Sequence, residues 1–168
     1  MRHIRNSEVA ETFNLVANLL DIQGANPFRV RAYRNAARVV AAESRSVAEM
    51  AEREHELETL PGVGRDLAGK IAEIVHTGEL SMLKELEKKT PASLTSMMRI
   101  PALGPKRIRA LFEGLGIKNI EELKAAAEAG KIKTLPGFSA KTEKRILEEI
   151  AKLRKRGPER VKWAEAED

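Results

Sequence analysis

The sequence has no cysteine, no long apolar run and few aromatic residues, with one Trp, one Tyr and four Phe among 168 residues. Without cysteine there can be no disulfide, cysteine-ligated zinc or cysteine nucleophile, as is usual in a reducing compartment. No apolar run approaches the roughly 18 residues of a membrane span, and the first residues lack the apolar stretch of a secretory signal. These absences predict a cytoplasmic protein that has no membrane partner.

Alternating β-branched residues are also missing, and alanine, leucine, glutamate and lysine dominate instead. This composition predicts an all-α fold. We place a domain boundary near residues 80–90, so that two small helical domains (1–82 and 88–155) precede a basic-to-acidic tail (156–168). The expected helices, separated by glycine and proline, are residues 7–22, 27–42, 47–55, 65–76, 79–90, 105–115 and 140–155.

A short motif occurs three times, each time before an expected helix. We call the copies hairpin 1 (Leu60-Pro61-Gly62-Val63-Gly64), hairpin 2 (Ile100-Pro101-Ala102-Leu103-Gly104) and hairpin 3 (Leu135-Pro136-Gly137-Phe138-Ser139). The pattern is typical of helix-hairpin-helix elements, in which a tight turn brings backbone N–H groups and the positive end of a helix dipole to a phosphate. The net charge of +5 also favours a polyanion. The repeat therefore predicts binding to the DNA backbone.

The three copies differ at their glycines. In hairpin 2, Ala102 replaces the first glycine, which requires a negative φ at that position. In hairpin 3, Ser139 replaces the second glycine, and serine is a good N-cap for the helix expected at residue 140. Hairpin 3 is either a structural copy whose role is packing, which we favour, or a third DNA contact.

The candidate DNA contacts are the backbone N–H groups of hairpins 1 and 2 and the basic side chains beside them. Such contacts to phosphates hold register without reading sequence. The basic helix at 27–42 and the stretch 152–156 could add to them, or could be solvated faces, as charge runs often are. The candidate residues are Arg29, Arg34, Gly62, Gly64, Arg65, Gly104, Lys106 and Arg107.

Three longer segments carry a specific resemblance: NPFRVRAYRNAARVV (26–40), LPGVGRDLAGKIAEIVHTGEL (60–80) and IPALGPKRIRALFEGLGIKNIEEL (100–123). In order and spacing they resemble the N-terminal part of the family X DNA polymerases, above all the bacterial and archaeal branch, and they are similar to DNA polymerase beta. The resemblance implies a lyase-like domain at 1–82 and a duplex-binding helix-hairpin-helix subdomain at 88–155.

Two catalytic parts of that family are missing. A polymerase palm needs paired aspartates for two magnesium ions, and no Asp-x-Asp occurs. The phosphoesterase domain of bacterial members is rich in histidine, and the sequence has only His3, His55 and His76. The chain is therefore expected not to polymerise by itself, and it is either a piece of a longer polymerase or a separate protein.

The family's lyase domain removes a 5′-deoxyribose phosphate through a Schiff base, and Lys70 matches its nucleophile. On its expected helix Lys70 lies at the flank of an apolar face, where burial near Arg29 or Arg34 would lower the pKa of its amine. Tyr33 matches a tyrosine of the lyase pocket, and Glu73 matches a residue that could assist proton removal. The ordinary alternatives are a snorkelling surface lysine, a core tyrosine and an exposed glutamate.

Other positions depart from the family. Its 5′-phosphate pocket uses several lysines; two of those positions are Glu58 and Asp66, and Arg29 keeps the charge of a third. Binding of a 5′-phosphate is therefore in doubt. Phe28 replaces a histidine that stacks on a template base, and it retains the stacking surface.

The family's hairpins also hold a monovalent cation, Na⁺ or K⁺, through backbone carbonyls, and no other cofactor is required. Cation and phosphate attract each other directly. By position the carbonyls belong to Glu58, Leu60, Val63, Met98, Ile100 and Leu103.

Three functions remain open. The first is a monomeric, nucleoid-associated, sequence-independent DNA-binding module for gapped, nicked or end DNA in base-excision or end-joining repair, as the N-terminal part of a family X polymerase. The second is an active deoxyribose-phosphate or abasic-site lyase that uses Lys70. The third is a non-catalytic scaffold that docks protein or RNA. Salt separates protein docking from the first two, because phosphate binding weakens steeply as salt rises.

Overall fold

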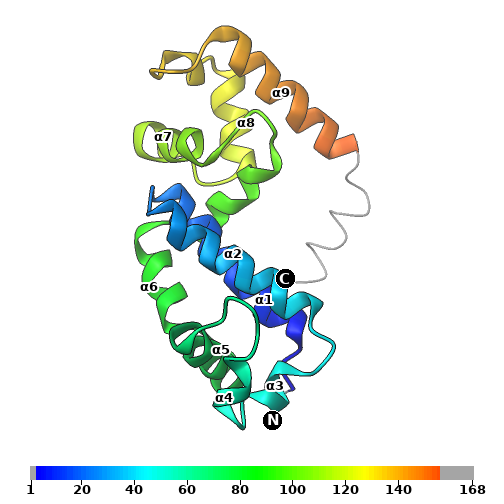
Figure 1. The fold of residues 1–168 in the computed structure, drawn as a ribbon. Coiled ribbons are helices and arrows are strands. Elements are labelled where there is room, and N and C mark those ends of the chain that lie inside the picture. The colour runs from blue at the N-terminus through cyan, green and yellow to red at the C-terminus, as the bar shows by residue number, and fades with distance from the viewer. Residues whose placement is uncertain (1–2, 156–168) are drawn as a thin grey trace. The chain divides into compact units, whose positions relative to one another are not determined.

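The computed structural model describes residues 3–155, so the tail expected at 156–168 lies outside the described residues. The described range is all-α and contains no strand, as predicted (Figure 1). The chain forms two compact units, Met1–Ala92 and Ser93–Asp168.

In the first unit, α1 (Asn6–Ile22) and α2 (Pro27–Ala42) pack side by side (Figure 1). Asn26 caps α2 by accepting a hydrogen bond from the Phe28 N–H at 2.8 Å, and Pro27 suits the first helical position. Helices α5 (Arg65–Thr77) and α6 (Ser81–Lys89) complete this unit. Its core is apolar and includes Phe13, Leu20, Tyr33, Val40, Leu57, Ile71, Ile74 and Leu80.

One predicted helix is wrong. The stretch 47–55 forms two four-residue helices, α3 (Val47–Met50) and α4 (Glu54–Leu57), instead of one. Short i→i+3 bonds from Glu52 N–H and Arg53 N–H end α3 after one turn, at 3.2 and 3.0 Å. The chain then turns, and the buried Leu57 joins the core before hairpin 1 begins.

The second unit contains η1 (Ala92–Arg99, a 3₁₀ helix), α7 (Pro105–Leu115), α8 (Ile120–Glu128), η2 (Ile132–Thr134) and α9 (Ala140–Lys155). Helix α9 packs on α8 and η2. The fully buried residues of this unit include Leu94, Met97, Ile100, Ile108, Leu111, Leu123, Ile132 and Ile146. Each unit therefore has an apolar core of its own.

Candidate nucleic-acid interface

All three hairpins contain the same tight turn. In each one the N–H of the fourth residue donates to the carbonyl of the first, at 3.0, 2.9 and 3.1 Å. Gly62 and Gly137 have φ of 77° and 84°, as the third position of a type II turn after proline requires. Ala102 has a negative φ, because no residue other than glycine has a positive φ in the described range. Hairpin 2 thus has the negative φ at Ala102 that its sequence requires.

The helices that follow hairpins 1 and 2 begin without a side-chain cap. Gly64 is the N-cap of α5 and Gly104 is the N-cap of α7. The first bonds to these caps come from Ala68 N–H and Ile108 N–H, at 2.9 and 3.1 Å. The N–H groups of the first turn therefore have no acceptor among residues 3–155. A Cβ at either glycine would meet nothing within 4 Å, so both N-termini are open to a ligand.

Hairpin 3 differs because its helix is capped. The Ser139 hydroxyl accepts a hydrogen bond from the Thr142 N–H at 3.1 Å, as its sequence predicted. The Phe138 side chain is buried, with 9% exposed. The geometry fits a packing role for this copy.

The basic side chains next to the hairpins are not equivalent. Arg65 and Lys106 are exposed beside the two open N-termini. Arg107 instead donates to the Ala102 carbonyl at 2.8 Å, and its guanidinium lies 5.7 Å from the centre of the Phe138 ring. Arg107 therefore braces hairpin 2 against hairpin 3.

Several of the other predicted residues line one cavity of about 480 Å³ in the first unit. Arg29 and Tyr33 come from α2, and Gly64 and Lys70 belong to the start and the middle of α5. Asp66 completes the lining together with Ala32 and Leu67. The cavity thus brings together five residues that the sequence analysis singled out.

The expected lowering of the pKa of Lys70 is wrong. Burial does lower it, but the hydrogen bond and charge of Asp66, together with Tyr33, outweigh burial and raise the pKa. The Lys70 ammonium donates to the Asp66 carboxylate at 2.7 Å, and 21% of the lysine side chain is exposed. The i,i+4 spacing of this pair was visible in the sequence.

Arg34 does not line the cavity. Its guanidinium donates to Asn18 at 2.9 Å and to Asp21 at 3.3 Å, both on α1. The positive charge expected near Lys70 is therefore partly neutralised, and only Arg29 remains at the cavity wall.

Tyr33 and Glu73 have structural contacts. The Tyr33 ring packs edge-on against Phe13 at 5.7 Å, and its hydroxyl donates to the sulfur of Met82 at 3.1 Å. Glu73 accepts hydrogen bonds from the backbone N–H and the hydroxyl of Ser81, at 2.8 and 2.6 Å. These bonds lower the pKa of Glu73. Glu73 is thus the cap of α6 and does not line the cavity.

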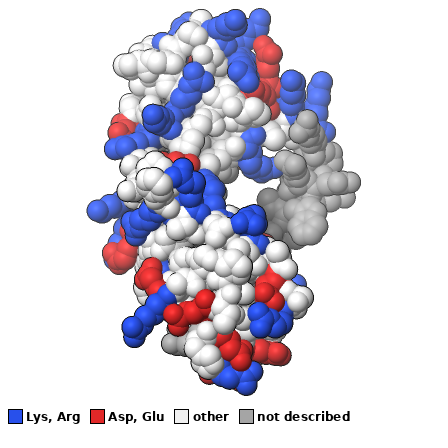
Figure 2. Space-filling model, viewed as in Figure 1, with Lys and Arg blue, Asp and Glu red and all other residues white. Residues whose placement is uncertain are grey.

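Phe28 is the one large apolar side chain that is strongly exposed in the described range, at 74%. The Arg31 guanidinium lies 4.6 Å from the centre of its ring. Figure 2 shows Lys and Arg side chains over α2, whereas acidic side chains gather nearer to α3, α4 and α5. An exposed ring within a basic surface can stack on a base.

Four of the backbone carbonyls expected to hold a cation differ in their hydrogen bonds. The carbonyls of Leu60 and Ile100 each accept one turn hydrogen bond and keep a second lone pair, whereas those of Val63 and Leu103 accept no bond from the described residues. Neutral carbonyl oxygens suit Na⁺ or K⁺.

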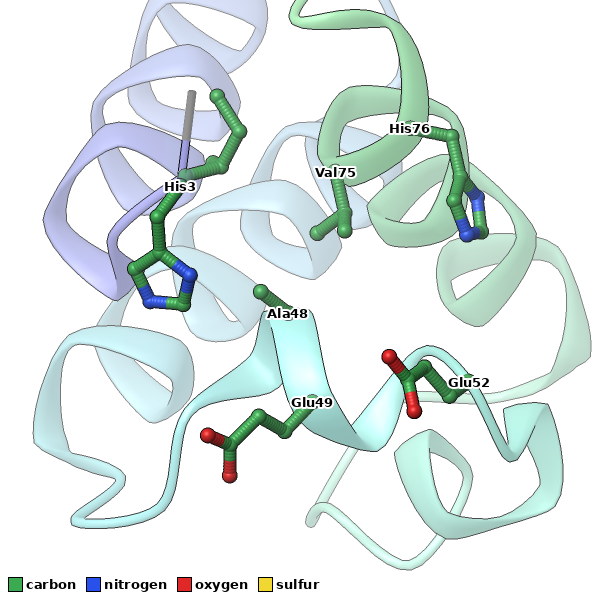
Figure 3. Close-up of a pocket in the computed structure, with 7 residues that line it drawn as sticks. His3, Ala48, Glu49, Glu52, Val75 and His76 are labelled. Atoms are coloured by element: carbon green, nitrogen blue, oxygen red, sulfur yellow. The ribbon is translucent and has the colours of Figure 1, made fainter. Parts of the chain in front are cut away.

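A second hollow, of about 290 Å³, lies elsewhere in the first unit (Figure 3). His3 and His76 stand on opposite sides of it, and Glu49 and Glu52 approach from α3 and the following turn. No group of three or more histidine or acidic side chains in the described chain could hold a metal ion. No helix among the described residues is long and apolar enough to span a membrane.

The sequence did not reveal one contact of hairpin 2. The Glu149 carboxylate of α9 accepts a hydrogen bond from the Ala102 N–H at 2.7 Å. No local pattern could have predicted it, because 47 residues separate the partners.

Comparisons with known proteins agree with these observations. A helix-hairpin-helix domain model matches residues 4–80, and a SAM-like helix-hairpin-helix tandem model matches residues 93–152. The chain is 32% identical over 157 residues to the "DNA polymerase/3'-5' exonuclease PolX" of Bacillus subtilis (strain 168). The match covers 94% of this chain but only 27% of that protein, at its N-terminal end.

Proposed function

From two helix-hairpin-helix domains that are related to the N-terminal part of a family X DNA polymerase, we propose that this chain is a sequence-independent DNA-binding module. Its targets are gapped, nicked or end-containing duplexes in DNA repair, and it acts as a monomer. The observation that carries the proposal is the pair of glycine-capped helix N-termini, one in each unit, whose first-turn N–H groups have no acceptor in the described chain.

Phosphate oxygens would satisfy these donors. A phosphate at Gly64 or Gly104 gains the N–H groups and the positive end of the helix dipole. Arg65 and Lys106 add full charges at the same places. All these contacts are to the backbone of DNA, so they hold the protein on any sequence.

Hairpin 3 suggests the test, since its serine shows how a side chain can occupy such donors. Gly64→Ser and Gly104→Ser should place a hydroxyl where the phosphate would bind. Both glycines have a negative φ and open space around the Cβ, so the variants should fold and be at least as stable as the native chain.

Each serine variant should bind a gapped duplex about tenfold more weakly, because a hydrogen bond to a charged group contributes about 1.5–3 kcal/mol and 1.4 kcal/mol is tenfold. Gly104→Ala is the matched control that adds the Cβ without the hydroxyl. Unchanged affinity in both serine variants would overturn the hairpin contacts, and a native chain that does not bind the duplex would overturn DNA binding itself. A native affinity that does not depend on salt would favour the protein-docking scaffold instead.

A monovalent cation at the carbonyls of hairpins 1 and 2 would strengthen the same contacts. We expect tighter binding in potassium chloride than in tetramethylammonium chloride of equal ionic strength, because the larger ion cannot approach the carbonyls of Val63 and Leu103. Equal affinity in the two salts would argue against the cation.

A second candidate function is lyase activity, which the cavity around Lys70 favours. The Lys70 amine would attack C1′ of the ring-opened sugar, and the adduct would lose water to form an imine. Loss of a C2′ proton to solvent would then break the C3′–O bond and release the strand as its phosphate, and water would hydrolyse the imine to return the amine. Borohydride trapping on a gapped duplex with a 5′-deoxyribose phosphate should give an adduct that Lys70→Ala lacks. No adduct from a chain that still binds DNA would leave a binding module alone.

A further inference from the structure

Helix α9 has most of its lysines on the face opposite its buried residues. At 3.6 residues per turn, four of its lysines fall on one side, opposite the buried Ile146 and Ile150. All four are exposed. These residues, which we call the α9 outer face, are Lys141, Lys144, Lys152 and Lys155.

Two of the three acidic residues of α9 lie away from this face. Glu143 is 8% exposed and accepts a hydrogen bond from the Lys133 N–H at 3.0 Å. The Glu149 side chain is 11% exposed and accepts bonds from the Ala102 N–H and from Arg145, at 2.7 and 3.0 Å. Both carboxylates hold the backbone near hairpins 2 and 3, and only Glu148 is left among the outer lysines.

Two lysines of α6 show the contrast. On α6, Lys84 pairs with Glu79 at 2.5 Å and Lys88 with Glu85 at 3.0 Å. None of the four lysines of the α9 outer face has a carboxylate partner within residues 3–155. Figure 2 shows basic side chains along α9 on both sides of an acidic group. An uncompensated surface of this kind attracts a polyanion.

We propose that the α9 outer face is a further contact for the phosphate backbone of duplex DNA, separate from the hairpins. This inference rests on the proposed DNA-binding function. The helix carries a lysine pair near each end, and 11 residues at 1.5 Å separate the pairs by about 16 Å. Lysine side chains at that separation can reach the two strands beside a major groove about 12 Å wide. Glu148 lies between the pairs, over the groove, where no phosphate is.

The test is the salt dependence of binding to an intact duplex. Lys141→Gln/Lys144→Gln and Lys152→Gln/Lys155→Gln should each reduce the log–log slope by up to about 1.8, since each lost phosphate contact removes about 0.9. Lys84→Gln/Lys88→Gln is the matched control, because it removes the same charge from paired lysines. Replacement of the outer lysines by arginine should keep the native slope.

The outcomes separate this inference from the proposed function. Native slopes in both α9 double variants would overturn the outer face, even if Gly104→Ser weakens binding. Reduced slopes in the α9 variants, with no effect of the serine variants, would support the outer face and overturn the hairpin contacts. A slope reduced equally by the α6 control would mean that only net charge matters, and would also overturn the inference.

Discussion

At Lys70 two influences on one amine oppose each other. Partial burial lowers its pKa, but Asp66 and Tyr33 raise the pKa by more than burial lowers it. The folded chain therefore holds the ammonium form. An amine attacks a carbonyl only after it has lost its proton. Asp66 therefore restrains any imine chemistry in the cavity that it lines.

Asp66→Asn should release that restraint. The variant removes the negative charge and leaves the burial, so the pKa of Lys70 should fall and the borohydride-trapping rate at neutral pH should rise several-fold. The pH profile of trapping should move to lower pH. Asp21→Asn is the control, since Asp21 is an aspartate of the same unit that pairs with Arg34 instead. A profile that does not move would show that Asp66 has no influence on the nucleophile.

Glu73 gives a prediction about stability and pH. Its pKa is lower in the folded chain than the ordinary value of 4.5, because the carboxylate accepts two bonds from Ser81. A lowered folded pKa means that the stabilisation is present above about pH 4.5 and is lost as the pH falls through the folded value. Acid should therefore weaken the attachment of the N-terminus of α6 to α5.

Glu73→Ala should lower the unfolding free energy by about 0.5–1 kcal/mol at pH 7, as the loss of an exposed cap does. The variant and the native chain should converge as the pH falls through the lowered pKa of Glu73. Urea unfolding at several pH values measures both effects. Glu79→Ala removes a nearby carboxylate that pairs only with the exposed Lys84, and it should change little. A loss that persists in acid would contradict the capping role.

The residue scale also shows where sequence reasoning failed. The pKa of Lys70 was expected to fall because Arg29 and Arg34 were counted as its neighbours. Arg34 is instead held by Asp21, and Asp66 lies one helical turn before Lys70. The Asp66–Lys70 pair follows from i,i+4 spacing. The Arg34–Asp21 pair depends on how α1 and α2 pack, which no local pattern specifies.

At the scale of elements, helix ends were predicted where a residue has a local reason to end a helix. Pro27 begins α2, and α5 ends at Gly78 with a φ of 79°. The two short helices that replace the expected helix at 47–55 have no such signal, since their separation follows from the turn after Met50 and the burial of Leu57. Tertiary packing overrides propensity there.

The turns of hairpins 1 and 3 differ in what surrounds their glycines. Gly62→Ala meets both a positive φ and the side-chain amide of Asn35, whereas a Cβ on Gly137 has a positive φ but open space. A left-handed φ costs an ordinary residue about 1–2 kcal/mol. We expect Gly137→Ala to lose about that much and Gly62→Ala to lose more.

The additional loss of unfolding free energy in Gly62→Ala should disappear when Asn35 is also replaced by alanine, which makes the prediction specific. In an Asn35→Ala background, Gly62→Ala should cost only the left-handed term, and urea unfolding of the four chains of the cycle measures the coupling. Ala102→Gly should be mildly destabilising, because Ala102 already has a negative φ. Equal losses at Gly62 in both backgrounds would show that Asn35 does not restrict the turn.

At the scale of the whole molecule, the two units carry different combinations of features. The first unit has hairpin 1, the cavity around Lys70 and the exposed ring of Phe28. The second has hairpin 2, braced by Arg107 and Glu149, and the α9 outer face. An aromatic side chain that stacks on a base needs an unpaired or unstacked base, whereas contacts to phosphates suit any duplex.

This division predicts that the two open N-termini contribute differently to discrimination between DNA forms. Gly64→Ser should reduce the preference for a gapped over an intact duplex, because it weakens the unit that holds Phe28. Gly104→Ser should weaken binding to both duplexes by a similar factor and leave the preference intact. Phe28→Ala should behave like Gly64→Ser, with Phe28→Trp as a control that keeps the stacking surface. Titration of gapped and intact duplexes at one salt concentration measures the ratio of affinities. If both serine variants reduce the affinities for the gapped and the intact duplex equally, the two units do not differ in their contribution to discrimination. Recognition of a gap must then depend on contacts other than those of hairpin 1 and Phe28.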